Sequence, residues 1–233
     1  MAWTTYTTLK TLEGIPAAVT TYDAMLQALI PQAETAIKRY CGRDFDQTIY
    51  PGVSTDGTGD GGFYSGDGTR SLLLRQRPVV SITSVYLDSA GRWGTNADGF
   101  DSTTLLVAGT DYSLRYDGYL GSAKCSYCGI LERIGATWPA TRWYTPGALT
   151  LDLQPGQGNV KVSYVAGWTT VPSDVVQALA LTVAYWRRIG AKGGNIASES
   201  QGAYSYSMAG AIAAGLPVEA RELLARYKEL SFA

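Results

Sequence analysis

The side chains most able to do chemistry in this chain are scattered carboxylates. Glycoside hydrolysis needs a pair of carboxyl groups, and the middle region could supply such a pair. Its candidates are Asp88, Asp98, Asp101, Asp111, Asp117 and Glu132. The chain contains no histidine, which excludes Ser-His-Asp catalysis, Cys-His catalysis and a histidine general base. The sequence therefore predicts that the protein is not an enzyme.

Metal and redox chemistry have little support in the sequence. Cys125 and Cys128 form a C-x-x-C, but a structural zinc needs four ligands and only Cys41 remains. The aspartates among the glycines of residues 52–68 lack the spacing of a twelve-residue calcium loop and are typical of turns. We expect neither a metal nor a cofactor.

The composition is that of a globular protein. Of 233 residues, 45% are hydrophobic and 17% charged, and the net charge of −1 gives no overall attraction to nucleic acid or to an anionic membrane. The longest apolar run, Val175–Trp186, is too short to span a bilayer. The N-terminus does not resemble a signal peptide. We therefore expect a soluble protein made in the cytoplasm, with no membrane partner.

Helical patterns occur near both ends of the chain. Residues 22–41 carry an apolar stripe, in which Pro31 should kink or split the helix and after which Gly42 should end it. A second helix is predicted over residues 174–189, with a stop at Gly190, and a third over 217–230. Residues 1–19 suggest a strand or an arm, and the Gly/Ala/Ser-rich stretch 190–215 an irregular segment.

The middle of the chain alternates as β-strands do. The clearest strands are 79–88 and 160–165, and weaker ones are predicted at 71–75 and 110–116. Residues 147–153 are expected to form a hairpin with 160–165. The predicted fold class is α+β: a small helical bundle built from the N-terminal and C-terminal parts, with an inserted antiparallel β-rich region. The expected parts are 1–44, 45–170 and 171–233.

Four motifs in a fixed order suggest a family. They are Ile37-Lys-Arg-Tyr-Cys-Gly-Arg-Asp-Phe45, Arg77-Pro-Val-Val-Ser-Ile-Thr-Ser-Val-Tyr86, Val162-Ser-Tyr-Val-Ala-Gly-Trp168 with Val171-Pro-Ser-Asp174, and a tail with Glu199–Tyr206 and Leu216–Glu219. In this order they resemble the head–tail connector proteins (adaptor or head-completion proteins) of long-tailed bacteriophages. The resemblance covers about half of the chain, and residues 89–150 look like an enlargement that it does not explain.

The resemblance implies a structural protein of the virion neck, assembled in the host cytoplasm. Such proteins form a homo-oligomeric ring, here expected to be a dodecamer, beneath the portal protein. The ring extends the channel for the genomic DNA, which passes without sequence-specific contact, and it supports the next neck or tail-terminator protein.

Two sets of residues are candidates for these contacts. We expect the segment 190–215 and the C-terminal helix to dock on the portal, through Tyr204, Tyr206, Leu216, Leu223, Leu224 and Tyr227. Charges that could face the channel or a neighbouring subunit are Lys38, Arg39, Arg43, Arg70, Arg75 and Arg77.

A second class of function also fits the sequence. A β-rich module of a phage tail or baseplate could bind carbohydrate or protein through aromatic loops. The residues concerned are Trp93, Tyr119, Trp138, Trp143 and Tyr144.

Overall fold

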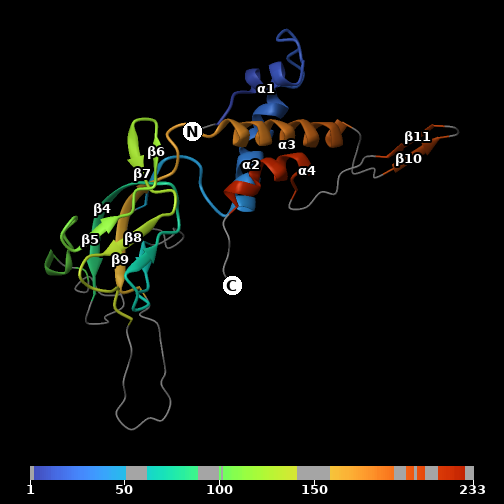
Figure 1. Ribbon diagram of the computed structural model, residues 1–233. Helices are drawn as coiled ribbons and strands as arrows, with labels where there is room; N and C mark the ends of the chain where they lie inside the picture. Colours follow the sequence, from blue (N-terminus) through green and yellow to red (C-terminus); the bar gives the residue numbers. More distant parts are fainter. Residues whose placement is uncertain are drawn as a thin grey trace, which may run out of the picture. The chain divides into compact units, whose positions relative to one another are not determined.

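The computed structural model describes residues 3–50, 62–88, 100, 102–140, 158–191, 198–201, 204–207 and 215–228. It confirms the α+β class: helices and several antiparallel sheets are present (Figure 1). Two compact units divide the chain. The first, here called the helical unit, comprises Met1–Phe45 and Thr170–Ala233, and the second, the β unit, comprises Asp46–Thr169.

Helix α3 (Ser173–Ala191) is the centre of the helical unit. It packs against α2 (Asp23–Cys41) and against α4 (Val218–Leu224), which continues as the short 3-10 turn η3 (Ala225–Tyr227) (Figure 1). The buried side chains of α2 recur every three or four residues, at Leu26, Ile30, Ala33, Ile37 and Cys41. This spacing places them on one face of the helix, which is the face that α3 covers.

Two helical predictions need correction. Residues 6–12 form a helix, α1 (Tyr6–Leu12), and not a strand or an extended arm, because the Thr5 side chain caps the N–H of Thr8 and Leu9 is fully buried. Of the two effects predicted for Pro31, a kink or a split, the split does not occur: α2 continues through Pro31 as one helix, although proline removes a backbone donor there. Burial on both sides of the proline, at Ile30 and Ala33, holds the helix together.

The helix ends are only partly as predicted. Gly42 does terminate α2, in the left-handed conformation at φ 69°. Gly190 does not stop α3, which runs to Ala191. Within the segment 190–215, where irregular structure was expected, β10 (Ser198–Gln201) pairs with β11 (Tyr204–Ser207).

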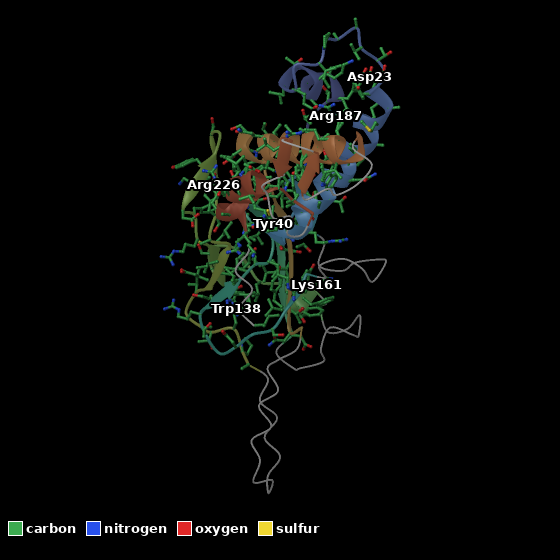
Figure 2. The ribbon with its side chains drawn as sticks, turned by 90° about the vertical axis from the view of Figure 1, so that its right-hand side faces the viewer. Asp23, Tyr40, Trp138, Lys161, Arg187 and Arg226 are labelled. Atoms are coloured by element: carbon green, nitrogen blue, oxygen red, sulfur yellow. The ribbon has the colours of Figure 1, made fainter. Side chains whose placement is uncertain are left out.

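Two buried ion pairs tie α1 to the other helices. The Lys10 ammonium, 4% exposed, lies 2.8 Å from the Asp23 carboxylate and donates to the backbone oxygens of Ala17 and Val19. The Glu13 carboxylate receives Arg187 from α3, with Nε 2.6 Å from Oε2 (Figure 2). Both positive groups are hydrogen-bonded by anionic or carbonyl oxygens, as a buried charge requires.

The β unit is organised around β9 (Val160–Ala166). β4 (Val79–Leu87) pairs antiparallel along one edge of β9, and β1 (Thr48–Tyr50) and β2 (Phe63–Tyr64) pair along the other. Gly167 ends β9 at φ +104°, where any added Cβ would lie 2.3 Å from the Asp46 carbonyl oxygen. The expected hairpin partner, residues 147–153, lies outside the described residues.

A second sheet covers the inner face of the first. It contains β3 (Ser71–Leu73), β8 (Ile130–Arg133) and β5 (Tyr112–Leu114), in that order. A separate hairpin is formed by β6 (Gly118–Leu120) and β7 (Ala123–Cys125). Alternate residues of the two sheets point inward and share one apolar core, in which Leu72, Leu114 and Leu131 meet Val85, Val160 and Val162.

A chain of tyrosine hydroxyls lies inside this core. The hydroxyl oxygens of Tyr64 and Tyr164 are 2.9 Å apart, and they accept the backbone N–H groups of Arg75 and Gln76 at 3.3 and 3.2 Å. Burial, together with the neighbouring Tyr64, raises the pKa of Tyr164 far above its ordinary value. The Tyr164 hydroxyl therefore stays neutral and satisfies the backbone donor of the buried Gln76.

Replacing Tyr164 by phenylalanine should destabilise the β unit by about 1–3 kcal/mol, because the Gln76 N–H and the Tyr64 hydroxyl would lose a buried partner. Urea unfolding of Tyr164→Phe against wild type measures this, with the exposed Tyr119→Phe as the control. The folded-state pKa of Tyr164 lies above the unfolded value of about 10. The stabilisation that the neutral Tyr164 hydroxyl contributes is therefore complete below about pH 10, and it is lost as the pH rises through the folded-state pKa. Equal stability of the two variants would contradict the result.

Candidate interaction surfaces

The described carboxylates of the β unit hold loops in place. Asp111 accepts the N–H of Val107 at 2.7 Å and lies beside the Arg133 guanidinium. Asp117 accepts the N–H groups of Tyr127 and Cys128 at 2.6 and 2.9 Å. Burial works against ionisation of Asp117, but the hydrogen bonds from Cys128 and Tyr127 outweigh it and lower its pKa.

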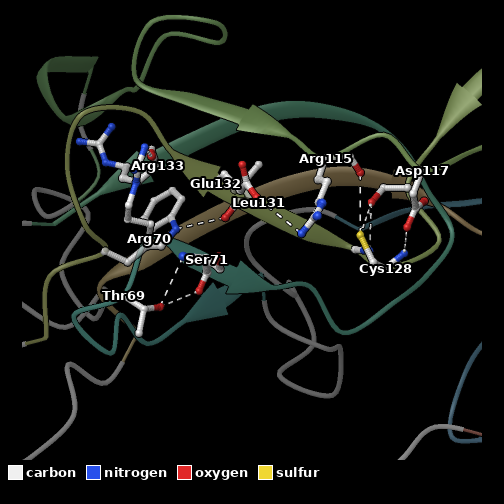
Figure 3. Close-up of polar contacts among 12 residues, drawn as sticks. Thr69, Arg70, Ser71, Arg115, Asp117, Cys128, Leu131, Glu132 and Arg133 are labelled. Atoms are coloured by element: carbon white, nitrogen blue, oxygen red, sulfur yellow. Dashed lines mark hydrogen bonds and ion pairs between the residues drawn. The ribbon is translucent and has the colours of Figure 1, made fainter.

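Glu132 forms only a long, exposed pair with Arg115, at 3.9 Å (Figure 3). Asp88 is 2% exposed, and its backbone N–H donates to the Asn159 carbonyl at 2.8 Å. Asp98 and Asp101 lie outside the described residues. Among the described carboxylates, Asp111 and Asp117 thus hold loops in place through backbone hydrogen bonds.

The three cysteines are separate free thiols. Cys41 and Cys125 are buried, and burial raises the pKa of both, that of Cys41 to about 11. Cys128 is half-buried, with its Sγ 3.4 Å from the Ser126 hydroxyl and 3.9 Å from the Arg115 carbonyl oxygen (Figure 3). Among the described residues, no three histidine, cysteine, aspartate or glutamate side chains gather where they could hold a metal.

The predicted portal-docking residues fall into three groups. Leu216, Leu224 and Tyr227 are buried inside the helical unit, at 0%, 0% and 8% exposure, so they hold α4 in place and offer no surface. Leu223 is half-buried on α4. Tyr204 and Tyr206 lie on β11, and their side chains are outside the described residues.

The first three predicted charges gather at the end of α2. Lys38 is 3.1 Å from Asp44 and lies over the Trp3 ring, while Arg39 is exposed and Arg43 half-buried. Two further cations, Arg226 and Lys228, come from the C-terminal part of the helical unit, and Lys228 lies over the Tyr40 ring. Sequence reasoning missed these two because about 180 residues separate them from α2.

The other three predicted charges lie in the β unit. Arg75 lies over the Tyr64 ring and donates to the Phe63 carbonyl, and Arg70 reaches the Arg133 carbonyl at 3.5 Å (Figure 3). Arg77 packs its side chain against Gly129, where an added Cβ would lie 2.6 Å from the Arg77 Cγ. These three arginines make local contacts with strands and loops of their own unit.

The β6–β7 hairpin exposes a group of tyrosines that was not predicted as an interface between subunits. Tyr116, Tyr119 and Tyr127 are 53%, 62% and 45% exposed. The Tyr127 ring lies on Gly118, where an added Cβ would be 2.3 Å from the ring, and its hydroxyl donates to the Tyr119 carbonyl. The base of the hairpin is fixed because Ser126 and Val79 exchange two backbone hydrogen bonds of 2.8 Å.

A second exposed apolar group lies on the loop before β5. Leu105 and Val107 are 45% and 58% exposed. The loop is rigidly held, since Asp111 binds the N–H of Val107 and Leu106 donates to Val85. The β6–β7 hairpin and the loop before β5 lie at different places on the β unit (Figure 1). The tyrosines of the hairpin and the loop with Leu105 and Val107 are therefore two separate groups of exposed apolar side chains on the β unit, which also exposes Ile49, Leu73 and Ile134.

Two of the five aromatic residues proposed for carbohydrate binding are described, and only one of them is exposed. Trp138 is fully buried, donates its indole N–H to the Leu131 carbonyl at 3.2 Å and is covered by Arg133 (Figure 2). It is a core residue. Trp93, Trp143 and Tyr144 lie outside the described residues, so of the five only Tyr119 is described and exposed.

Comparisons with known proteins give structural likenesses alone. No family model matches the chain, and no curated protein matches it. The neck of an empty GTA particle computed with C6 symmetry is 16% identical, with 97% of this chain and 90% of that one covered and a TM-score of 0.47. The neck of a native GTA particle computed with C12 symmetry is 17% identical, with 97% and 92% covered and a TM-score of 0.45. A virion of a native gene transfer agent particle gives 19% identity, 94% and 85% coverage and a TM-score of 0.46.

None of the described helices combines the length and the apolar character needed to cross a membrane.

In the native protein, a thiol reagent should modify one cysteine per chain quickly. That cysteine is Cys128, because Cys41 and Cys125 are buried and their pKa values are raised. Labelling followed by peptide mass analysis identifies the residue, and Cys128→Ser should abolish the fast phase. Rapid labelling of Cys41 in the folded protein would contradict the burial of the α2 end.

Proposed function

We propose that this protein is a structural component of a phage-like virion neck. In this proposal it forms a ring beneath the portal, joins head to tail and extends the DNA channel. The observation that carries the proposal is the packing of α3 against both α2 and α4, because the sequence resemblance implies a helical bundle built from these same segments. The β unit is inserted between α2 and α3, in the order that the resemblance implies.

Two groups of exposed apolar side chains on the β unit suit a ring. A closed ring of identical subunits needs two different faces that complement one another. The tyrosines of the hairpin and the loop with Leu105 and Val107 are different in composition and position, and each is fixed by hydrogen bonds. Tyrosine is enriched at interfaces. We assign these two surfaces to contacts between neighbouring subunits.

Docking on the portal is assigned to the segment between α3 and α4. Tyr204 and Tyr206 are retained as contact residues and Leu223 as an accessory one. Leu216, Leu224 and Tyr227 act indirectly, because their burial anchors α4. The end of the segment is anchored by the hydrogen bond that the Trp186 indole N–H donates to the Gly215 carbonyl.

The test of the proposal is assembly. Light scattering and negative-stain images of the purified protein, alone and with the portal protein of the same particle, should give rings or a complex with one subunit per portal subunit. A monomer that ignores the portal would contradict the proposal. A glycan-binding screen would then test the β-rich module of a tail or baseplate.

The hairpin tyrosines supply a sharper prediction. Tyr116→Ser combined with Tyr119→Ser should weaken association between subunits at least about ten-fold, since exposed aromatic anchors contribute most of the energy of an interface. Sedimentation at several concentrations measures the change. Tyr22→Ser, which alters an exposed tyrosine of the helical unit, is the matched control. Unchanged association of the double variant would remove the hairpin from the ring interface.

Portal docking is tested without disturbing the helical core. Tyr204→Ser combined with Tyr206→Ser should reduce binding to the portal while leaving ring formation and thermal stability as in wild type. A deletion that includes α4 is not suitable, because it removes Leu216, Ala220 and Leu224 from the core. Full portal binding by the double variant would show that docking uses another surface.

A further inference from the structure

The helical unit has one strongly basic surface. It consists of Lys38 and Arg39 in the last turn of α2, Arg43 just beyond it, Arg226 in η3 and Lys228 after it. Arg39 and Lys228 are exposed, and Arg226 is 66% exposed. Figure 2 shows Tyr40 of α2 and Arg226 in the same region of the unit.

Aromatic rings connect these cations. Trp3 and Phe45 lie 5.4 Å apart and Phe45 and Tyr227 5.5 Å apart, both edge to face. Lys38 lies over the first ring of this row and Arg226 over the last, at 5.8 and 4.8 Å from the ring centroids. Cation–π contacts of this kind hold the cations in position without neutralising them.

Lys228 and Arg43 belong to the same surface. The Lys228 ammonium is 5.4 Å from the centre of the Tyr40 ring. Burial raises the pKa of Cys41, and the charges of Arg43 and Lys228 both act to lower it, so both cations lie within electrostatic reach of that thiol. The surface is therefore assembled from two stretches of chain at opposite ends of the sequence.

Three carboxylates of the described residues contact members of this surface or of its aromatic row. Asp44 pairs with Lys38, Asp174 pairs with Arg226 and Glu34 accepts the N–H of Trp3. The α2 dipole accounts for Lys38 and Arg39, because cations stabilise the C-terminal end of a helix. It does not account for Arg226 and Lys228, which come from another element. Arg39 and Lys228 are both exposed to solvent on this surface.

The large exposed apolar side chains of the helical unit lie away from this surface. Among the described residues of the helical unit, the large apolar side chains that are exposed are Leu12, Tyr22 and Met25, at α1 and the start of α2. α2 is roughly 28 Å long, so its length separates them from the basic end. Protein interfaces combine an apolar core with a polar rim, whereas a nucleic-acid backbone is bound mainly by charge.

We propose that this basic surface, formed by Lys38, Arg39, Arg43, Arg226 and Lys228, contacts the phosphate backbone of double-stranded DNA. The identity of that DNA as a packaged genome rests on the proposed function. The contact carries no sequence preference, because charge alone recognises the backbone. It is weak and sensitive to salt, since exposed cations are screened.

The experiment measures the salt dependence of DNA binding. Fluorescence anisotropy with a labelled duplex of random sequence gives the slope of log K against log salt, which reports the number of phosphates neutralised. Arg39→Gln combined with Lys228→Gln should reduce the magnitude of this slope by about two, one for each cation lost. Neither side chain contributes to the buried core.

The matched control is Arg188→Gln combined with Arg115→Gln. It makes the same change in net charge at two exposed cations elsewhere in the chain, and its slope should equal that of wild type. An equal reduction in both variants, no reduction in the first, or no DNA binding by wild type at low salt would each overturn the proposal. Loss of subunit or portal association by the first variant, with its slope unchanged, would assign the surface to an acidic protein partner instead.

Ring formation by the same variants separates this inference from the proposed function. Rings together with an unchanged DNA slope would overturn only the DNA contact. A reduced slope in a protein that forms no ring and ignores the portal would leave the DNA contact standing without the neck role.

Discussion

Strand β9 has hydrogen-bonded neighbours along both of its edges, and the β unit depends on this arrangement. β4 pairs along one edge, and β1 and β2 along the other. Its inward side chains, Val160, Val162, Tyr164 and Ala166, are all almost fully buried. The chain then passes from β9 to α3, which has the corresponding position in the helical unit, between α2 and α4. A single stretch of about 30 residues thus supplies the central element of each unit.

Residues of the same type have different roles in this protein, because some of them are buried and others are exposed. Tyr164 is a core residue whose hydroxyl satisfies a backbone donor, while Tyr119 projects from a hairpin with its ring in solvent. Trp138 likewise belongs to the core, although its sequence context resembles that of an exposed loop aromatic. Type and spacing alone cannot separate these cases, because the same ring stabilises a core and an interface by removing apolar area from water.

The charged residues divide in a similar way. Arg75 and Arg77 are occupied by neighbouring strands and loops of the β unit. Arg39 and Lys228 remain exposed at the end of α2, and Lys228 lies over the Tyr40 ring. The division between occupied and exposed cations is thus a property of the tertiary packing, and it gives the two units different surfaces: apolar in the β unit and basic at one end of the helical unit.

Periodicity by itself determined the α+β class, the α2 and α3 stripes and the two long strands β4 and β9, because a 3.6-residue or two-residue repeat of apolar side chains reflects one buried face. It failed for α1, whose seven residues bury chiefly Leu9, and for Gly190, which lies inside α3 and not after its end. Only the tertiary structure decided that Leu216, Leu224 and Tyr227 are core, and that Arg226 and Lys228 join Lys38. These outcomes depend on which distant segments meet, and contacts between residues about 180 positions apart leave no local pattern in the sequence.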